Sequence, residues 1–267
     1  MTPREQILEA MRERRRLLIL YSGGLDSTLL AKLAHDALGS NAATLTIDSA
    51  LIPRSEISSS KTFAEEIGIG QNIVHSMEVE EEHFRMNPPD RCYLCRKARD
   101  AVAWQWAREH EFEHIADGLS YSDLSDYRPG LRAATEDRIW HPFIEFKLGK
   151  KEIRCLSREL GLSGWDRPSM ACLASRFPHG FGIDPVRVDR VDRAEEYLRG
   201  LGFTCVRVRH FPYNLAFVEV DDISRAVRMK DEIVARLREL GFAFVSVDLE
   251  QFASGKMNRT AVTPAHG

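Results

Sequence analysis

A short polar loop, Ser22-Gly23-Gly24-Leu25-Asp26-Ser27, is the sequence feature that most constrains how this chain can fold. It follows the apolar run 17–20 and precedes a stretch, 27–38, in which leucine and alanine recur at helical spacing. A buried strand that turns through two glycines into a helix leaves backbone N–H groups unpaired, and the helix dipole adds to their positive field. Because glycine lets the backbone close around an anion without a Cβ clash, the sequence predicts a phosphate-binding turn here.

The spacing of this loop is neither that of a P-loop nor that of a dinucleotide-binding turn. The loop resembles the SGGxDS motif of the pyrophosphatase-loop ATPases, which cleave ATP to AMP and pyrophosphate while they adenylate a substrate. That resemblance implies that Asp26 helps to hold Mg²⁺ and that Ser22, Ser27 and the amides of Gly23 and Gly24 hold the pyrophosphate. Ser22 and Asp26 are therefore candidate catalytic residues. A turn that binds nothing is the alternative, and the six matching positions argue against it.

Short apolar runs alternate with helical stretches in the first half of the chain. The expected strands lie near 17–21, 42–47, 72–76 and 113–117, and the expected helices near 27–38, 54–67 and 92–110. This alternation predicts an α/β fold with a doubly wound parallel sheet, like that of the adenine-nucleotide alpha hydrolases. Since ligands bind at the carboxyl ends of such strands, we expect Asp48 and Gly118 beside the loop, with Asp48 at the adenosine end of ATP.

The pattern changes after Trp165-Asp166-Arg167-Pro168, a boundary signal because residues before proline avoid the helix. From Pro185 the order is helix, strand, strand, helix, strand, at about 186–199, 203–209, 215–220, 222–240 and 243–248. We therefore expect an ATP-binding domain over 1–168 and a smaller α+β domain over 169–267, which begins with an irregular linker at 169–184.

Composition limits the class of protein. No apolar run approaches the roughly 20 residues that span a bilayer, and the charged start of the chain is unlike a secretory signal, so we expect a cytoplasmic protein with no membrane contact. The net charge of −3 argues against a general electrostatic grip on nucleic acid. Five cysteines, an odd number, favour metal or catalytic use over a disulfide framework in that compartment.

Three of these cysteines stand in informative positions. Cys92 and Cys95 form a CxxC pair, a spacing found in zinc sites, iron–sulfur sites and redox motifs, and also compatible with two buried thiols at a helix start. Cys172 lies in the linker, four residues before Arg176, and a nearby guanidinium both favours a thiolate and binds phosphate. A lone cysteine more often packs than reacts, but beside an adenylating loop Cys172 is a candidate nucleophile.

Five motifs, taken with the loop, make the chain similar to the LarE family of ATP-dependent sulfur transferases over nearly its whole length. They are Cys92-x-x-Cys95 and the segments 126–130, 152–154, 165–168 and 171–176. The resemblance implies that a carboxylate of pyridinium-3,5-biscarboxylic acid mononucleotide attacks the α-phosphate of ATP. Sulfur then replaces the adenylate, and two rounds make the bis-thiocarboxylate of the nickel-pincer nucleotide cofactor. The resemblance also implies a homo-oligomer.

The family uses two sulfur sources. In one, the cysteine at the position of Cys172 attacks the adenylate and is left as dehydroalanine. In the other, Cys92, Cys95 and Cys172 hold a 4Fe-4S cluster whose open iron carries a hydrosulfide. We favour the cluster, because the CxxC pair has no role in the sacrificial scheme. Zinc is a third possibility that needs a fourth ligand, for which His75 and His83 carry no specific signal.

The resemblance also assigns residues to the phosphate of the substrate, namely Ser175, Arg176, Arg207, Arg209 and, as a further candidate, Arg128. Alternate positions of a strand face the same way, so Arg207 and Arg209 can form one clamp. The alternative is a solvent-facing pair of arginines on an amphipathic strand. Cys155 and Cys205 are expected to be structural. The chain departs from the family at 250–255, where a Tyr-Arg-Ser-Gly run is common.

Other functions share parts of this pattern. An adenylating tRNA thiolase has the same loop and cysteine chemistry, but it should carry a broad basic face or an RNA-binding module. A synthetase that uses ammonia would not need Cys172. A non-enzymatic nucleotide sensor would bind ATP in the loop without splitting it, and pyrophosphate release separates that case from any enzyme.

Overall fold

The computed structural model describes residues 1–125, 129–167, 171–250 and 256–257. The chain folds into two compact units, Met1–Glu78 with Asp90–Met170 and Val79–Pro89 with Ala171–Gly267. The segment 79–89 therefore leaves the first unit, joins the second and returns, a crossing that no pattern in the sequence indicates.

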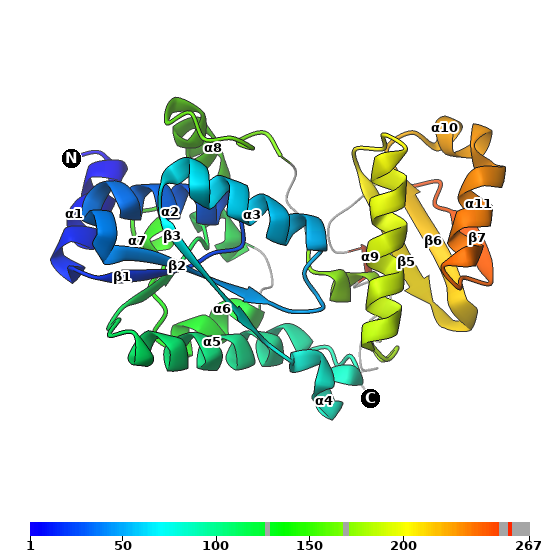
Figure 1. Ribbon diagram of the computed structural model, residues 1–267, viewed down its shortest axis with the longest axis horizontal. Coiled ribbons are helices and arrows are strands. Elements are labelled where there is room, and N and C mark those ends of the chain that lie inside the picture. Colours follow the sequence, from blue (N-terminus) through cyan, green and yellow to red (C-terminus); the bar gives the residue numbers. More distant parts are fainter. Residues whose placement is uncertain (126–128, 168–170, 251–255, 258–267) are drawn as a thin grey trace. The chain divides into compact units, whose positions relative to one another are not determined.

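A four-stranded parallel sheet in the order β3-β2-β1-β4 forms the centre of the first unit (Figure 1). Its strands are β1 (Leu17–Leu20), β2 (Ala42–Asp48), β3 (Gly70–His75) and β4 (Ile115–Asp117). The helices of this unit are α1 (Pro3–Arg14), α2 (Leu25–Leu38), α3 (Arg54–Ile67), α5 (Arg91–Glu109), α6 (Pro129–Glu136), α7 (Pro142–Glu145) and α8 (Lys150–Glu159). The predicted parallel sheet is confirmed, and each expected strand is present within a few residues.

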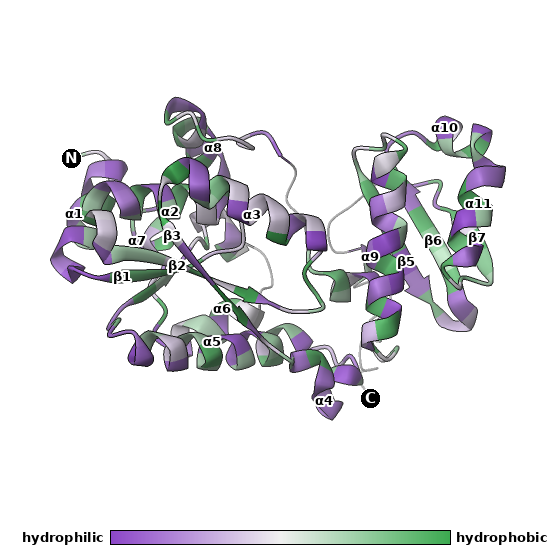
Figure 2. Cartoon of the chain, in the orientation of Figure 1, coloured by the Kyte–Doolittle hydropathy of each residue, from purple (hydrophilic) through white to green (hydrophobic). Residues whose placement is uncertain are grey.

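Both faces of this sheet are covered by helices. Successive residues of a strand point to opposite sides, and on β1 Leu17 and Ile19 pack with α1, α2 and α8 while Leu18 packs with α5 and α6. Figure 2 shows hydrophobic residues along β1 and β2, whereas the helices carry both hydrophobic and hydrophilic residues. The near-continuous apolar strand is the expected mark of a parallel sheet buried on both faces.

A three-stranded sheet in the order β5-β6-β7 forms the second unit. β5 (Val206–Phe211) runs antiparallel to β6 (Leu215–Val220), and β7 (Phe244–Val247) runs parallel to β6. The helices of this unit are α4 (Glu82–Arg85), α9 (Pro185–Gly200), α10 (Ile223–Arg228) and α11 (Lys230–Glu239). The predicted α+β class is confirmed. The single helix expected over 222–240 is wrong, because the backbone leaves the helical region at Met229 (ψ 15°) and separates α10 from α11.

Short 3₁₀ helices complete the described part of the chain. They are η1 (Gly39–Asn41), η2 (Glu78–Glu80), η3 (Tyr121–Ser125), η4 (Leu173–Arg176) and η5 (Pro212–Asn214). Within the described ranges, every helix is too short or too polar to cross a bilayer.

Candidate active site

The polar loop joins β1 to α2, and its two serines close it. The Ser27 hydroxyl donates to the Gly24 carbonyl (3.0 Å) and accepts from the Ser22 amide (3.2 Å), and the two hydroxyl oxygens lie 3.1 Å apart. Gly24 is the N-cap of α2 and makes no side-chain hydrogen bond to its first turn. No cap side chain therefore competes for the N–H groups at this helix end, which is the arrangement that binds phosphate.

Two glycines allow the loop to pack closely against its neighbours. A Cβ at Gly23, where φ is +73°, would lie 2.7 Å from the Cβ of Ser60 on α3. A Cβ at Gly118, directly after β4, would lie 2.8 Å from the Ser27 nitrogen. Gly118 is therefore brought against the loop from the carboxyl end of β4, where the sequence places it.

Two aspartates end strands at the same edge of the sheet. Asp48 ends β2 and forms an ion pair with Arg54 (2.8 Å). Asp117 ends β4 and accepts hydrogen bonds from Arg96 and from the Nδ1 atom of His141, each at 2.7 Å. Burial alone would raise the pKa of Asp117, but Arg96 and His141 outweigh it and hold that pKa below its ordinary value. Asp117 is therefore an anion at neutral pH.

Asp26 forms an ion pair with Lys150, the first residue of α8. The Lys150 ammonium also lies 3.6 Å from an oxygen of Asp123. A carboxylate that attracts an ammonium group also suits Mg²⁺, a hard cation that prefers oxygen ligands. Asp26, the residue that the resemblance assigns to Mg²⁺, therefore has its carboxylate in a position that already attracts a positive charge.

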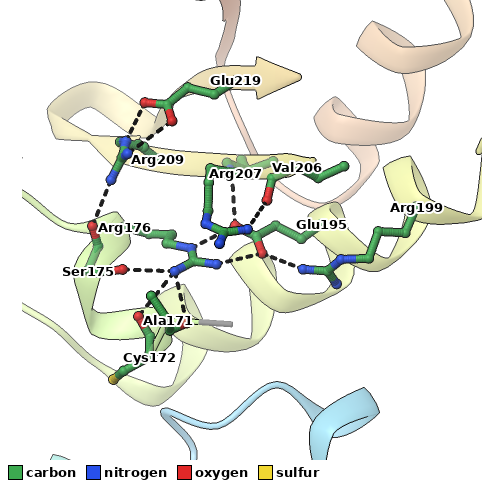
Figure 3. Close-up of polar contacts among 11 residues, drawn as sticks. Ala171, Cys172, Ser175, Arg176, Glu195, Arg199, Val206, Arg207, Arg209 and Glu219 are labelled. Atoms are coloured by element: carbon green, nitrogen blue, oxygen red, sulfur yellow. Dashed lines mark hydrogen bonds and ion pairs between the residues drawn. The ribbon is translucent and has the colours of Figure 1, made fainter. Parts of the chain in front are cut away.

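Cys172 is exposed and directly precedes η4 in the second unit. Arg176 of η4 is completely buried. One nitrogen of its guanidinium donates to the carbonyls of Ala171 (3.0 Å) and Cys172 (3.2 Å) and to the Ser175 hydroxyl (2.8 Å) (Figure 3). The other two donate to both oxygens of Glu195 on α9, at 2.7 and 2.9 Å. Arg176 therefore anchors the backbone that carries Cys172.

Glu195 is the buried centre of this arrangement. It also accepts from Arg199 (2.7 Å) and from the Val208 amide on the outer edge of β5 (3.0 Å). Burial would raise the pKa of Glu195, but Arg176 and Arg199 outweigh it and hold that pKa below its ordinary value. The charge of Arg176 is neutralised inside the unit, so a contact between Arg176 and substrate phosphate would require this pair to open.

Arg207 and Arg209 are both buried, 6% and 5% exposed, so the solvent-facing alternative is wrong. Arg209 pairs with Glu219 on β6 through two hydrogen bonds (2.6 and 2.9 Å) and donates to the Ser175 carbonyl (3.0 Å). Arg207 donates to the Val206 carbonyl (2.6 Å). The second unit thus brings Ser175, Arg207 and Arg209 together around the segment that follows Cys172 (Figure 3).

Arg128, the further phosphate candidate, lies outside the described residues. The three cysteines expected to hold a metal come from both units, Cys92 and Cys95 from the first and Cys172 from the second. None of the three forms a disulfide within the described ranges, and in those ranges no three His, Cys, Asp or Glu side chains are already gathered to hold a metal. The donor set fits an iron–sulfur cluster in its chemistry, because thiolates are the ligands of such clusters and the first turn of α5 sets two of them three positions apart.

Sequence reasoning missed Lys150, Glu195 and Glu219. The i,i+4 spacing of Glu195 and Arg199 is a weak local signal of an ion pair, but such spacing most often belongs to an exposed pair on a helix surface. The principal partners of these carboxylates are remote in the sequence, because Glu195 pairs with Arg176 and Glu219 with Arg209. No local pattern identifies such partners.

Comparisons with known proteins extend over both units. A family model described as asparagine synthase matches residues 4–98. An uncharacterised protein of Synechocystis is 39% identical over 96% of this chain and 96% of its own length. The pyridinium-3,5-bisthiocarboxylic acid mononucleotide synthase of Lactiplantibacillus plantarum is 33% identical over 97% of this chain and 95% of that protein. An uncharacterised protein of Methanocaldococcus jannaschii is 30% identical over 90% of this chain and 92% of its own length.

Proposed function

Because this chain belongs to the LarE family of ATP-dependent sulfur transferases, we propose that it adenylates a carboxylate of pyridinium-3,5-biscarboxylic acid mononucleotide and converts the adenylate to a thiocarboxylate. The name of the Lactiplantibacillus relative specifies a bisthiocarboxylate product, so the proposal entails two rounds per molecule. The observation that carries it is the loop closed by Ser22 and Ser27, with an uncapped helix end and close glycine contacts at the carboxyl edge of the sheet.

The first step forms the adenylate. A carboxylate oxygen of the substrate attacks the α-phosphorus of ATP, and the bond from that phosphorus to the departing pyrophosphate breaks. The loop amides and the hydroxyls of Ser22 and Ser27 stabilise the pyrophosphate, because donors fixed at a helix N-terminus need no reorganisation as charge develops. Asp26 helps to hold Mg²⁺ at the phosphates, and Lys150 supplies a second cation beside it. Asp48 borders the adenosine, and Gly118 lies against the loop that holds the phosphates.

The substrate phosphate is assigned to Ser175, Arg207 and Arg209, since guanidinium groups bind phosphate through parallel N–H bonds. Arg209 is paired with Glu219, so a phosphate there needs another cation to compensate this carboxylate. The Lys256 ammonium is a partial source of that charge, because it lies 3.8 Å from a Glu219 oxygen in a nearly buried position but also pairs with Asp248 and Glu250. Lys256 stands directly after the segment in which this chain departs from its family.

The second step delivers sulfur. A sulfur nucleophile adds to the carbonyl carbon of the adenylate, and the bond from that carbon to the AMP oxygen breaks. If the nucleophile is Cys172, its Cβ–S bond then breaks as Cα loses a proton, and the residue becomes dehydroalanine. In the other route Cys92, Cys95 and Cys172 would hold a 4Fe-4S cluster, which would supply sulfur as hydrosulfide, and an external sulfide donor would replace that hydrosulfide after each turnover. We favour the cluster, because Cys92 and Cys95 of α5 have no part in the sacrificial route.

The test is the intact mass of anaerobically purified protein, with iron quantified, before and after reaction with ATP, Mg²⁺ and the pyridinium substrate. We expect pyrophosphate release, an unchanged polypeptide and about four irons per chain. Replacing Cys92, Cys95 or Cys172 by serine should remove the iron, whereas the matched change at the exposed Cys155 should not. Loss of hydrogen sulfide from Cys172 of an iron-free protein would exclude the cluster, and absence of pyrophosphate release would exclude the adenylation.

A further inference from the structure

One face of the three-stranded sheet has a charged half and an aromatic half. Successive residues of a strand alternate between the two faces, and Val208, Ala216 and Val218 lie on the buried apolar face. The opposite face carries six larger side chains of β5 and β6, namely Arg207, Arg209, Phe211, Leu215, Phe217 and Glu219. The proposed reaction uses the arginines of this face, and it gives the aromatic side chains no part.

Phe217 is the aromatic residue nearest in the sheet to the arginines assigned to substrate phosphate. It stands directly opposite Arg209 in the antiparallel pair, and the Cβ atoms of such opposite residues lie about 5 Å apart. The ring of Phe211 meets the ring of Phe217 edge to face, with centroids 5.9 Å apart and an interplanar angle of 78°. This contact fixes the Phe217 ring, which is only half-buried. A ring that is held in place and partly exposed can receive a flat ligand.

The charges of this face match those of a pyridinium mononucleotide, which has a phosphate at one end and an aromatic cation at the other. Arg207 and Arg209 suit the phosphate. Glu219 lies two residues from Phe217 on β6, about 6.8 Å along the strand. A cationic ring on Phe217 is attracted by the electron-rich face of the phenyl group and by this carboxylate. The cation also adds to Lys256 the positive charge that Glu219 needs when Arg209 binds phosphate.

We propose that Phe217 is the platform on which the pyridinium ring of the substrate stacks, with Phe211 holding the platform in place. This inference rests on the proposed function, because it takes the phosphate to be held by Ser175, Arg207 and Arg209. The spacing of neighbouring residues on one face of a strand is comparable to the span of the ribose between phosphate and ring, so both ends of the substrate fit the same face. Phe217 therefore selects a charged ring over a neutral one.

The test is calorimetric titration of the full chain with three probes. They are nicotinic acid mononucleotide, which has a pyridinium ring, its reduced dihydropyridine form, which has a neutral ring, and ribose 5-phosphate, which has none. The wild type should bind the pyridinium probe about fivefold more tightly than the reduced form. Phe217→Ala should weaken binding of the pyridinium probe about tenfold and leave ribose 5-phosphate unchanged. Phe217→Tyr should keep the wild-type affinity, whereas Phe217→Leu, which is apolar but has no ring, should not.

Phe244→Ala is the matched control, because Phe244 lies opposite Leu215 on the next strand, is 62% exposed and should not affect any probe. Wild-type affinity of Phe217→Ala for the pyridinium probe would overturn the inference and leave the phosphate site in place. Arg207→Ala tests that site separately, since wild-type binding of ribose 5-phosphate in this variant would overturn the phosphate assignment and the platform with it. Should Phe217→Ala fail to fold, as judged by circular dichroism, Phe217→Leu decides, and wild-type affinity in that variant would overturn the inference.

Discussion

Gly118 shows how one missing side chain sets the geometry of the candidate site. The Cβ of an alanine there would lie 2.8 Å from the Ser27 nitrogen and 2.9 Å from the Asp26 carbonyl carbon. Both are backbone atoms, so no side-chain rotation can relieve the contact and the phosphate loop itself must move. A displacement of about 1 Å at a reacting centre can cost about 100-fold in rate.

We therefore expect Gly118→Ala to slow pyrophosphate formation by about 10- to 100-fold and to weaken ATP binding. Gly70→Ala on β3 is the control, because a Cβ there meets no atom within 4 Å and should leave both quantities unchanged. Pyrophosphate assays and calorimetric titration with ATP measure the effect. Equal rates and ATP affinities in the two variants would show that neither ATP binding nor its cleavage depends on the close approach of Gly118 to the loop.

His210 is a second residue whose environment has a measurable consequence. It is fully buried on β5 among the rings of Phe177, Phe181 and Phe242, with centroid distances of 5.1 to 5.7 Å. Burial lowers the pKa of His210 to about 4, with smaller contributions from nearby arginines, although the hydrogen bond from its Nε2 atom to the Asn214 side-chain oxygen (3.3 Å) acts in the opposite direction.

Acid should therefore destabilise the second unit through His210. The unfolded chain binds a proton near pH 6.5 and the folded chain only near 4, so its contribution is complete above pH 6.5 and falls by about 1.4 kcal/mol per pH unit below it. His210→Phe should flatten this dependence between pH 6.5 and 4.5, whereas His114→Phe, at an exposed position, should not. Urea unfolding followed by circular dichroism at several pH values measures it, and parallel curves for wild type and His210→Phe would refute the assignment.

At the scale of the elements, α9, β5 and η4 are joined by one carboxylate. Glu195 accepts hydrogen bonds from Arg176 of η4, from Arg199 of its own helix and from the edge amide of β5. Breaking a buried pair by removing one charge costs about 3–5 kcal/mol, because the remaining charge stays buried without compensation. The segment that carries Cys172 should therefore be held in place mainly by this residue.

Glu195→Gln should reduce the unfolding free energy of the second unit by about 3 kcal/mol or more and lower sulfur transfer, while ATP binding by the first unit persists. Asp189→Asn is the matched change on the same helix, where Asp189 forms an exposed pair with Arg193 worth at most about 1 kcal/mol. Denaturant unfolding and a thiocarboxylate assay distinguish the two variants. A stability loss no larger than that of Asp189→Asn would contradict the anchoring role.

The sequence predicted elements better than the partners between them. Alternation of apolar runs was sufficient for the parallel sheet, because buried strands and amphipathic helices each have a distinct period. The period-2 rule also placed Arg207 and Arg209 on one face. It could not show that Glu219 stands opposite Arg207 in the sheet and pairs with Arg209, because both facts depend on the register between β5 and β6. The break at Met229 was missed for a related reason, since the apolar pattern continues through it.

On the scale of the whole molecule, the chain crosses between its units more often than its sequence indicates. The segment 79–89 lies between β3 and α5 in the sequence but belongs to the second unit. Two backbone hydrogen bonds hold it there, from Gly180 to the Asn87 carbonyl and from Ile183 to the Arg85 carbonyl, both 2.9 Å. The cysteine pair of the first unit follows this segment directly in the sequence.

Asn87 is the residue on which this crossing depends. It is fully buried with φ at +56°, a conformation that asparagine adopts more readily than most residues. Its side-chain amide donates to the carbonyls of Pro178 (2.7 Å) and Phe181 (3.0 Å). Alanine at this position would lose both donors and add the strain of a positive φ, which together should cost about 2–5 kcal/mol.

We expect that cost to fall on the second unit alone. In Asn87→Ala, hydrogen exchange should accelerate in peptides covering β5 and β6 and stay at the wild-type rate in peptides covering β1 and β2. Asn87→Gly also loses the two side-chain hydrogen bonds, but glycine adopts a positive φ without strain. The acceleration of hydrogen exchange in this variant should therefore lie between those of the wild type and Asn87→Ala. Asn41→Ala, at an exposed position in η1, should change neither set of peptides. Equal acceleration in β1 and β5 would mean that the two units unfold together. In that case Asn87 would stabilise the entire chain and not only the second unit.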